Sequence, residues 1–569
     1  GDEPSGLVPT GWPTSARRGK LGGLPRPGDP AFHRGTPMAV HALPTRLSRP
    51  NAMDPLPFLS RCRNRVGRLL PRLVLILLPG AFYVSSPVVA QEGPDPVSVS
   101  EIRVPRFPMP LSTLSLSGPP RAGEYLGVTG SRSAWLGYET GEGEVWVHPL
   151  KIARNVRLAF RIPDYSEPIP GALVAREVET RPGHVIVTYS HGAFVVRQHV
   201  MAPRDLPGVL ILLEVDPVVD LSIQVEFEPV LQYAWPGGFG GQYLFWDLAH
   251  RGFILSESLR ERNAVIGSPW ATEASAHPAH RLADAPSVFL IPVDPARARK
   301  ELIPIAVAGG IAPRDQILAT YREILERAPD IAREVAGWAA SLEKGLSLGG
   351  PEPASSALEW AKVNLAEQRV CNPDLGCGFV AGWGPSGTSF RPGFGWYFGG
   401  DAAINSLAMD ATGQWEEVAE ALRFLARYQR DDGKIPHEIS QAAGRVPWFR
   451  DFPYAYYHAD TTPFWMLALW HYWRASGDDG LVRELWPAFS KAYRWCLSVE
   501  TDGDGIIENT TGGLGAIEVG GWGKESTRTS IWRPCGPPPC RERPRWRRPW
   551  ETHPWPGRPR VSSGRPEPP

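Results

Sequence analysis

The spacing of apolar residues changes once along this chain, near residue 313, and the change divides the sequence into two kinds of structure. Before it, short alternating or continuous apolar runs are separated by Gly, Pro and Asp, as in 184–189, 193–200, 209–215, 221–227 and 288–293. Many short strands joined by turns, with few helices, predict an antiparallel β-sandwich domain over 100–312.

Helical spacing follows from Arg314 onward. Residues 313–350 predict one or two helices, which we interpret as a helical linker. Five further helical segments are then expected at Ala357–Val370, Asp401–Met409, Trp415–Gln429, Thr462–Ala475 and Leu481–Val499. The long loops between them hold glycines, aromatics and carboxylates, which is typical of a helix-hairpin toroid with a site at one end. The sequence therefore predicts part of such a toroid over 351–523.

The N-terminal residues do not have the sequence pattern of a packed domain. Residues 1–52 are rich in Pro, Gly and Arg without apolar periodicity, so we interpret them as non-native or disordered. Residues 53–90 contain a basic stretch, a short apolar run and small residues before Gln91, which is the order of a secretory signal peptide. An uncleaved anchor is the alternative, but the apolar run is shorter than the roughly 20 residues of a membrane span. We therefore expect a periplasmic or secreted protein without stable membrane insertion after cleavage.

The C-terminal tail, 524–569, is rich in Trp, Pro and Arg and has no period. Disordered tails are normally poor in aromatic residues, so a shifted reading frame explains it better. If the codons are suitable, translation that begins one base earlier, on the last base of the Lys524 codon, gives Gly-Ile-His-Gln-Asp-Ile-Tyr-Leu-Ala-Ala. This alternate sequence has the pattern of an amphipathic helix start. We expect the chain to be an incomplete piece of its intact gene product, and the nucleotide sequence decides between these readings.

Charge and cysteine content exclude some functions. The 60 basic and 60 acidic residues give zero formal net charge, and the chain has no basic helix of the kind that nucleic acid requires. Six cysteines without a paired CxxC argue against a zinc site. Cys371 and Cys377 are close enough in sequence for a disulfide in an oxidising compartment, and two free thiols are the equal alternative.

Two sequence patterns are similar to known ligand-binding motifs, but we interpret both as structural. Residues 382–387 match GxGxxG, but they follow no predicted strand and open no helix, so no dinucleotide site is expected. Residues 502–505, Asp-Gly-Asp-Gly, are similar to a calcium loop, yet Thr511 stands where the bidentate Glu would be if Glu500 were the first ligand. We predict a tight turn between helices there, and no metal.

Four segments carry the functional prediction. Each puts carboxylates beside aromatics at a helix start or turn: 394–403 (Phe-Gly-Trp-Tyr-Phe-Gly-Gly-Asp-Ala-Ala), 431–438 (Asp-Asp-Gly-Lys-Ile-Pro-His-Glu), 456–463 (Tyr-Tyr-His-Ala-Asp-Thr-Thr-Pro) and 502–508 (Asp-Gly-Asp-Gly-Ile-Ile-Glu) with 515–518 after it. A lone Asp at a helix N-cap is routine. Four such elements at successive loops indicate one site.

The order of these elements resembles that of bacterial glycogen-debranching (amylo-alpha-1,6-glucosidase) proteins, within the glucoamylase-type six-hairpin glycosidase superfamily. The resemblance covers roughly 350–523, and the strand-rich region resembles their N-terminal sandwich more loosely. It implies an (α/α)6 toroid, here incomplete, and inverting hydrolysis of alpha-glucosidic linkages in glycogen- or starch-like oligosaccharides. It also implies no metal and no organic cofactor.

The resemblance also implies residue roles. Asp401 corresponds to the aspartate that grips sugar hydroxyls, and Trp396 and Tyr397 to the wall beside it. Glu518 is the expected general acid and Glu438 the second choice. Inversion needs an acid and a base about 6.5 to 9.5 Å apart, and the superfamily's base lies in a loop before the last helix, which this chain lacks. We therefore expect this piece alone to be inactive.

Further substrate-binding residues are expected at His437, His458 and Asp460, although His458 and Asp460 fit equally well as cap and core residues. Many relatives have Arg where Gly400 stands, so a charged substrate contact is missing here. Other toroid enzymes (a trehalase, an alpha-mannosidase or a disaccharide phosphorylase) and a non-catalytic carbohydrate-binding protein are the alternatives.

Overall fold

The computed structural model describes residues 98–513, except 164, 278–281, 283, 284 and 351, together with the backbone of 528 and 529. The expected signal peptide (53–90), the residues before it and nearly all of the tail lie outside the described residues, so these assignments stay predictions. Within the described part, no helix is both long and apolar enough to cross a bilayer.

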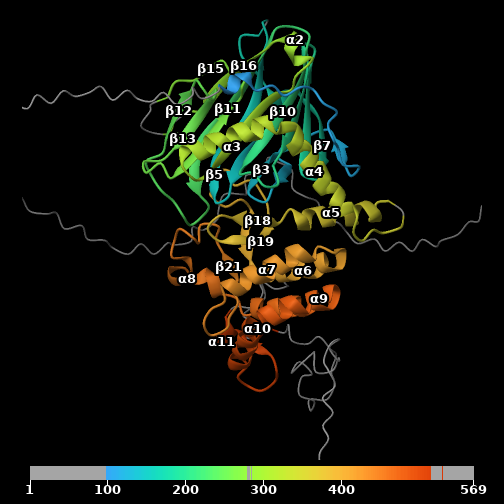
Figure 1. The fold of residues 1–569 in the computed structure, drawn as a ribbon, viewed down its shortest axis with the longest axis vertical. Coiled ribbons are helices and arrows are strands. Elements are labelled where there is room, and N and C mark those ends of the chain that lie inside the picture. Colours follow the sequence, from blue (N-terminus) through green and yellow to red (C-terminus); the bar gives the residue numbers. More distant parts are fainter. Residues whose placement is uncertain are drawn as a thin grey trace, which may run out of the picture. The chain divides into compact units, whose positions relative to one another are not determined.

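Two antiparallel sheets form the strand-rich region (Figure 1). In spatial order, the nine-stranded sheet consists of β1 (Leu116–Gly118), β7 (Ala175–Arg181), β8 (His184–His191), β9 (Phe194–Met201), β10 (Gly208–Pro217), β17 (Ile303–Ile311), β14 (Arg262–Gly267), β13 (Gly252–Ser256) and β12 (Tyr243–Asp247). The eight-stranded sheet consists of β15 (Glu273–Ala274), β16 (Ser287–Val293), β11 (Leu221–Tyr233), β5 (Leu150–Arg161), β4 (Gly143–Val147), β3 (Ser133–Tyr138) and β2 (Tyr125–Thr129), with β6 (Ile169–Pro170) paired to β5. Short helical turns are η1 (Val99–Glu101), α1 (Gly171–Val174) and α2 (Pro295–Ala298).

Strand β10 shows what packs against each of the two faces of the nine-stranded sheet. Val209 and Ile211 belong to the core that the sheet shares with β11 of the other sheet, which is the packing of the predicted sandwich. Leu210 and Leu212 point the opposite way and pack against a helix. Because β10 is buried on both faces, its sequence is continuously apolar instead of alternating.

The helix over β10 is α3 (Arg314–Glu326), and it is followed by α4 (Ala328–Glu343). Figure 1 shows α3 lying across the sheet. Tyr321 and Ile324 of α3 are fully buried in the cluster that contains Leu210 and Leu212. The residues interpreted from sequence as a linker therefore cover the outer face of the nine-stranded sheet.

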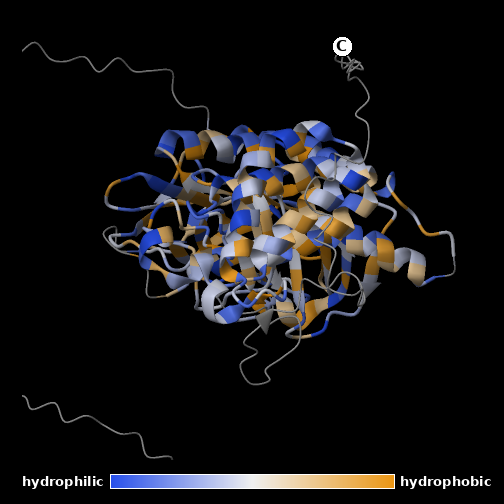
Figure 2. Ribbon diagram, turned by 90° about the horizontal axis from the view of Figure 1, so that it is seen from below, coloured by the Kyte–Doolittle hydropathy of each residue, from blue (hydrophilic) through white to orange (hydrophobic). Residues whose placement is uncertain are grey.

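Five longer helices follow, each overlapping a predicted segment: α5 (Ala354–Ala366), α6 (Gly399–Thr412), α7 (Trp415–Arg427), α9 (Thr461–Ser476) and α10 (Asp479–Val499). Helix α6 packs against α7 and α9, and α10 packs against α9 and α7. Gly413 and Gly477 end α6 and α9 at φ 84° and 72°, a left-handed conformation that glycine adopts without steric cost. Figure 2 shows apolar residues gathered toward the interior and hydrophilic residues on outward turns.

A small four-stranded sheet, which the sequence did not predict, lies between α5 and α6 along the chain and takes in one later strand. It consists of β18 (Arg369–Asn372), β19 (Gly376–Gly382), β20 (Phe394–Phe398) and β21 (Glu438–Ile439). Cys371 and Cys377 face each other across β18 and β19 and form a disulfide, one of the two alternatives left open by the sequence. The remaining short elements are α8 (Trp448–Asp451), η2 (Pro453–Tyr456), β22 (Ile507–Glu508), α11 (Asn509–Gly512) and β23 (Arg528–Thr529).

Candidate functional site

The small sheet brings together three of the four sequence elements. Phe398 pairs with Glu438 across β20 and β21, and Gly399 N–H donates to the His437 carbonyl at 2.7 Å. A Cβ on Gly399 would lie 2.3 Å from the Pro436 carbonyl oxygen, so the close approach of these loops requires glycine. The third element joins through His458, whose ring stacks on that of His437.

Glu438 is the central carboxyl group of this arrangement. Trp396 Nε1 donates a hydrogen bond to Glu438 Oε1 at 2.7 Å, and both residues are 8% exposed. Burial raises the pKa of Glu438, while the Trp396 hydrogen bond and the charge of Arg391 oppose that shift. A buried carboxyl group with a raised pKa retains its proton at a higher pH than a solvated one, as a general acid must.

Trp235 is the site residue that sequence reasoning missed. It lies in the loop after β11 of the sandwich, and its ring centroid is 6.5 Å from that of Trp396 and 5.6 Å from that of Trp448. The Arg391 guanidinium lies 3.8 Å from the ring centroid of Trp235. The sequence signal for Trp235 was its place in the turn-forming stretch Ala-Trp-Pro-Gly-Gly. A tryptophan in such a loop cannot be buried in the core as part of a strand. We call Glu438, Trp396, Trp235, Trp448 and Arg391 the Glu438 site.

Two stacked histidines lie beside the Glu438 site. The ring centroids of His437 and His458 are 3.6 Å apart with an interplanar angle of 10°. Burial, His458 and Lys434 together lower the pKa of His437 to about 3, so its ring is neutral near pH 7. His458 Nδ1 lies 3.7 Å from Asp460 Oδ1, and Asp460 precedes the first turn of α9. His458 and Asp460 are 5% and 4% exposed, so both side chains are buried.

The two remaining described candidates are placed differently. Asp401 lies in the first turn of α6 and is half-buried. Tyr397, expected on the wall beside Trp396, lies instead in the helical core, where its ring packs on Phe424 at 4.5 Å between centroids. Successive residues of a strand point to opposite faces, so Trp396 and Tyr397 cannot both line one wall. Glu518, the first choice for the acid, lies outside the described residues.

A cavity of about 510 Å³ adjoins the aromatic residues around Trp235. Phe452, which contacts the Trp235 ring at 6.4 Å between centroids, is one of its lining residues. The others are Arg430, Phe449, Pro453, Tyr456, Tyr457, Asn509 and Gly513. The cavity is lined by aromatic rings and few charges, as expected for a neutral ligand.

Among the described residues, two groups of side chains have metal-ligand spacing. In the first, Cys371 and Cys377 are already joined by the disulfide. The second consists of carboxylates whose oxygens lie within 4.8 Å of one another: Glu500, Asp502, Asp504 and Glu508. Their oxygens accept backbone hydrogen bonds, such as Ile506 N–H to Asp504 at 2.8 Å and Thr501 N–H to Glu508 at 2.8 Å. Gly503 and Gly505 both have φ of 80°, as in the tight turn expected from the sequence.

Comparison with solved structures gives distant similarities to carbohydrate-active enzymes. A bacterial glucoamylase in complex with acarbose has 10% identity and a TM-score of 0.48, covering 71% of this chain and 62% of its own. A candidate kojibiose phosphorylase from the human microbiome has 9% identity and a TM-score of 0.47, covering 72% and 62%. A family 92 alpha-mannosidase from Bacteroides thetaiotaomicron, in complex with mannoimidazole, has 8% identity and a TM-score of 0.25, covering 74% and 64%.

This chain thus spans 62% of the length of each of the first two structures. No protein-family description matches the sequence, and no curated protein does. Similarity at this level assigns neither a substrate nor a residue role.

Proposed function

We propose that this chain belongs to an inverting glycoside hydrolase that acts on alpha-glucosidic linkages of glycogen- or starch-like oligosaccharides, and that its helices are the front part of an (α/α)6 toroid. The observation that carries the proposal is the buried Glu438 carboxyl group, held by Trp396 within an aromatic cluster. An acid must be protonated before it can donate to a glycosidic oxygen, and burial favours the protonated form of Glu438.

The surroundings of Glu438 suit a neutral sugar. Trp235 and Trp396 offer apolar rings with polar edges, and the neutral His437 adds no charge to the wall. Because Oε1 of Glu438 accepts from Trp396, the proton of its acid form belongs on Oε2. Asp401, in the first turn of the adjacent helix, is the proposed acceptor for sugar hydroxyls.

Glu518 and Glu438 are the two candidates for the general acid. The sequence resemblance favours Glu518, and the described geometry supports Glu438. An inverting enzyme needs a second carboxylate about 6.5 to 9.5 Å from the acid to activate water. The Cys371–Cys377 disulfide supports the accompanying proposal of a periplasmic or secreted protein, because disulfides persist in oxidising compartments.

The test measures glucose release from maltotriose and a branched dextrin, with and without phosphate. It uses this chain, which alone is expected to be inactive, and the intact gene product read in the alternate frame after Lys524. Proton NMR of the first product identifies the anomer, and the proposal expects inversion. Glu438→Gln should lower kcat by at least about 100-fold if Glu438 is the acid, whereas Glu416→Gln, an exposed carboxylate of α7, should leave it unchanged.

The other possible results of this test lead to different conclusions. Loss of turnover in Glu518→Gln but not in Glu438→Gln assigns the acid to Glu518. Cleavage that requires phosphate replaces the hydrolase with a disaccharide phosphorylase. Oligosaccharide binding by the intact gene product without turnover refutes the hydrolase and favours a carbohydrate-binding protein.

A further inference from the structure

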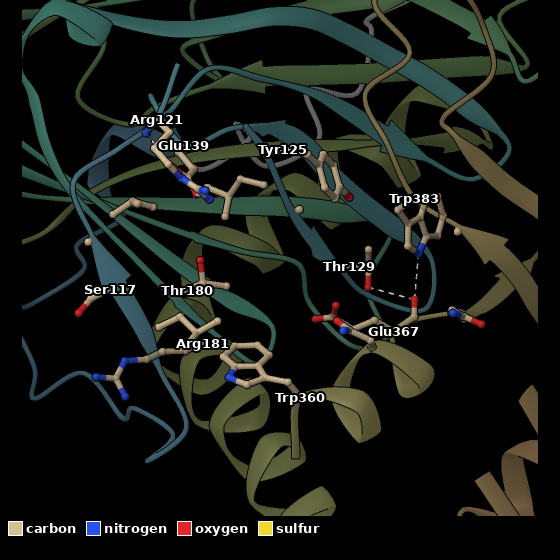
Figure 3. A pocket seen from close by; sticks show the side chains of 18 of the residues that line it. Ser117, Arg121, Tyr125, Thr129, Glu139, Thr180, Arg181, Trp360, Glu367 and Trp383 are labelled. Carbon is tan, nitrogen blue, oxygen red and sulfur yellow. Dashed lines mark hydrogen bonds and ion pairs between the residues drawn. The ribbon is translucent and has the colours of Figure 1, made fainter. Parts of the chain in front are cut away.

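A second cavity, of about 690 Å³, lies between the sandwich and α5, and no residue of the Glu438 site lines it (Figure 3). Its volume is within the range of about 300 to 1,000 Å³ that small-molecule sites usually have. The walls come from the edge strands β1 and β2, from β7, from α5 and from Gly382 and Trp383 at the end of β19.

Aromatic side chains reach this cavity from three separate elements. Figure 3 shows Tyr125 of β2 near Trp383, with Trp360 of α5 on the helix side below them. Trp383 Nε1 donates to the Glu367 carbonyl at 3.0 Å. Trp360 Nε1 is buried, and none of the described residues accepts its hydrogen bond. Because that nitrogen is buried, Trp360 presents the carbon atoms of its ring to the cavity.

Polar groups accompany the aromatic rings. Burial raises the pKa of Glu367 to about 7, against the opposing charge of Arg204, so near neutral pH its carboxyl group both donates and accepts hydrogen bonds. Asn364 of α5 and Gln368, in the turn after α5, also line the cavity, and Gln368 Oε1 accepts a hydrogen bond from Asn405. Thr129 and Thr180 add hydroxyl groups from the strands.

The charged residues of the lining are largely neutralised within the protein. The Arg121 guanidinium donates two hydrogen bonds to Glu139, at 2.8 and 3.2 Å. Arg181 forms an ion pair with Glu179. The cavity therefore offers aromatic rings and paired hydrogen-bonding groups instead of an unbalanced field that would select an ion.

We propose that this cavity is a second saccharide-binding site, which takes a neutral oligosaccharide with one ring against Trp360 and its hydroxyls toward Asn364, Gln368 and Glu367. Ligand hydroxyls both donate and accept hydrogen bonds, which matches side-chain amides and a carboxyl group, and the apolar face of a sugar ring matches the ring of Trp360. The choice of a glucan as the first probe and the binding event expected at the Glu438 site rest on the proposed function.

The test is isothermal titration of the full chain with maltotriose and, separately, cellotriose. We expect two binding events, one lost in Trp396→Ala and the other weakened about tenfold in Trp360→Ala, the loss that an aromatic ring contact would cause. Asn364 is exposed, so Asn364→Ala should fold normally and weaken only the second event, by about threefold. Trp486→Ala, on α10, is the matched tryptophan control.

A single binding event abolished by Trp396→Ala overturns the inference, and so does unchanged binding in both Trp360→Ala and Asn364→Ala. Binding of an extended peptide along the β1 and β2 edges, with neither trisaccharide bound, overturns it in favour of a peptide site. If the intact gene product has no turnover but Trp360-sensitive sugar binding persists, the hydrolase proposal fails and this inference stands.

Discussion

The contact between the sandwich and the loop before the Glu438 site depends on a buried charge pair. Lys151 Nζ lies 2.8 Å from Glu144 Oε2, and the two side chains are 1% and 4% exposed. Lys151 also donates to Ser386 Oγ at 2.5 Å and to the Gly387 carbonyl at 2.7 Å, while Glu144 accepts from Ser386 N–H at 2.8 Å. The loop that matches GxGxxG in sequence is therefore held by the sandwich.

Replacing Lys151 with Met tests this anchor. The substitution keeps most of the side-chain volume but leaves Glu144 as a buried, uncompensated charge, which costs about 3 to 5 kcal/mol of folding free energy. That loss is large beside a total stability of about 5 to 15 kcal/mol. Urea unfolding followed by tryptophan fluorescence measures it, and Lys491→Met, at an exposed position of α10, should cost no more than about 0.5 kcal/mol.

The double variant Lys151→Met with Glu144→Gln separates charge from packing. Gln keeps an oxygen for Ser386 and Trp146 but carries no charge, so the double variant should recover at least half of the loss. A loss below about 1 kcal/mol in the single variant would refute the buried-charge reasoning, and so would a double variant less stable than Lys151→Met alone.

Three further predictions follow from other contacts. Trp396→Phe removes the hydrogen bond that lowers the pKa of Glu438, so the alkaline limb of the pH–rate profile should move to higher pH, and an unchanged limb would exclude Glu438 as the titrating acid. Burial lowers the pKa of His199 from 6.5 to about 4, so between these values the unfolded state binds the extra proton and stability falls as pH falls. His199→Gln should therefore reduce the slope of unfolding free energy against pH by about 1 kcal/mol per pH unit between pH 4 and 6.5, and an equal slope in variant and wild type would contradict this. Reducing the Cys371–Cys377 disulfide, or replacing both residues with Ser, should cost about 2 kcal/mol because the closed loop is short, and identical melting curves with and without reductant would show that no disulfide forms.

The helices could be predicted from the sequence because helical spacing of apolar residues is a local pattern. The segment expected at Trp415–Gln429 is observed as α7, Trp415–Arg427, since its apolar residues recur with a strong helical period. The strand β20 was not predicted, because its five residues show no polar alternation and one of its two pairing partners, β21, lies about 40 residues later. Without that strand, Trp396 and Tyr397 could not be assigned to opposite faces.

Three of the segments that the motifs single out lie close together, but the motifs do not include every residue around Glu438. Residues 394–401, 437–438 and 458–460 do meet, as their shared pattern predicted. Trp235 precedes them by about 160 residues and belongs to a domain with a different periodicity, so no local pattern connects it to Glu438. Such a contact follows from tertiary packing alone.

The contacts of Trp235 and Lys151 set an order of events during synthesis. Both residues leave the ribosome well before Ser386, Arg391 and Trp396, and N-terminal domains generally fold first as the chain emerges. The sandwich is therefore a template already in place when the helical loops arrive. A helical region made alone, beginning at Ala354, would have no partner for the rings of Trp396 and Trp448 that face Trp235, and these apolar surfaces would favour aggregation over folding.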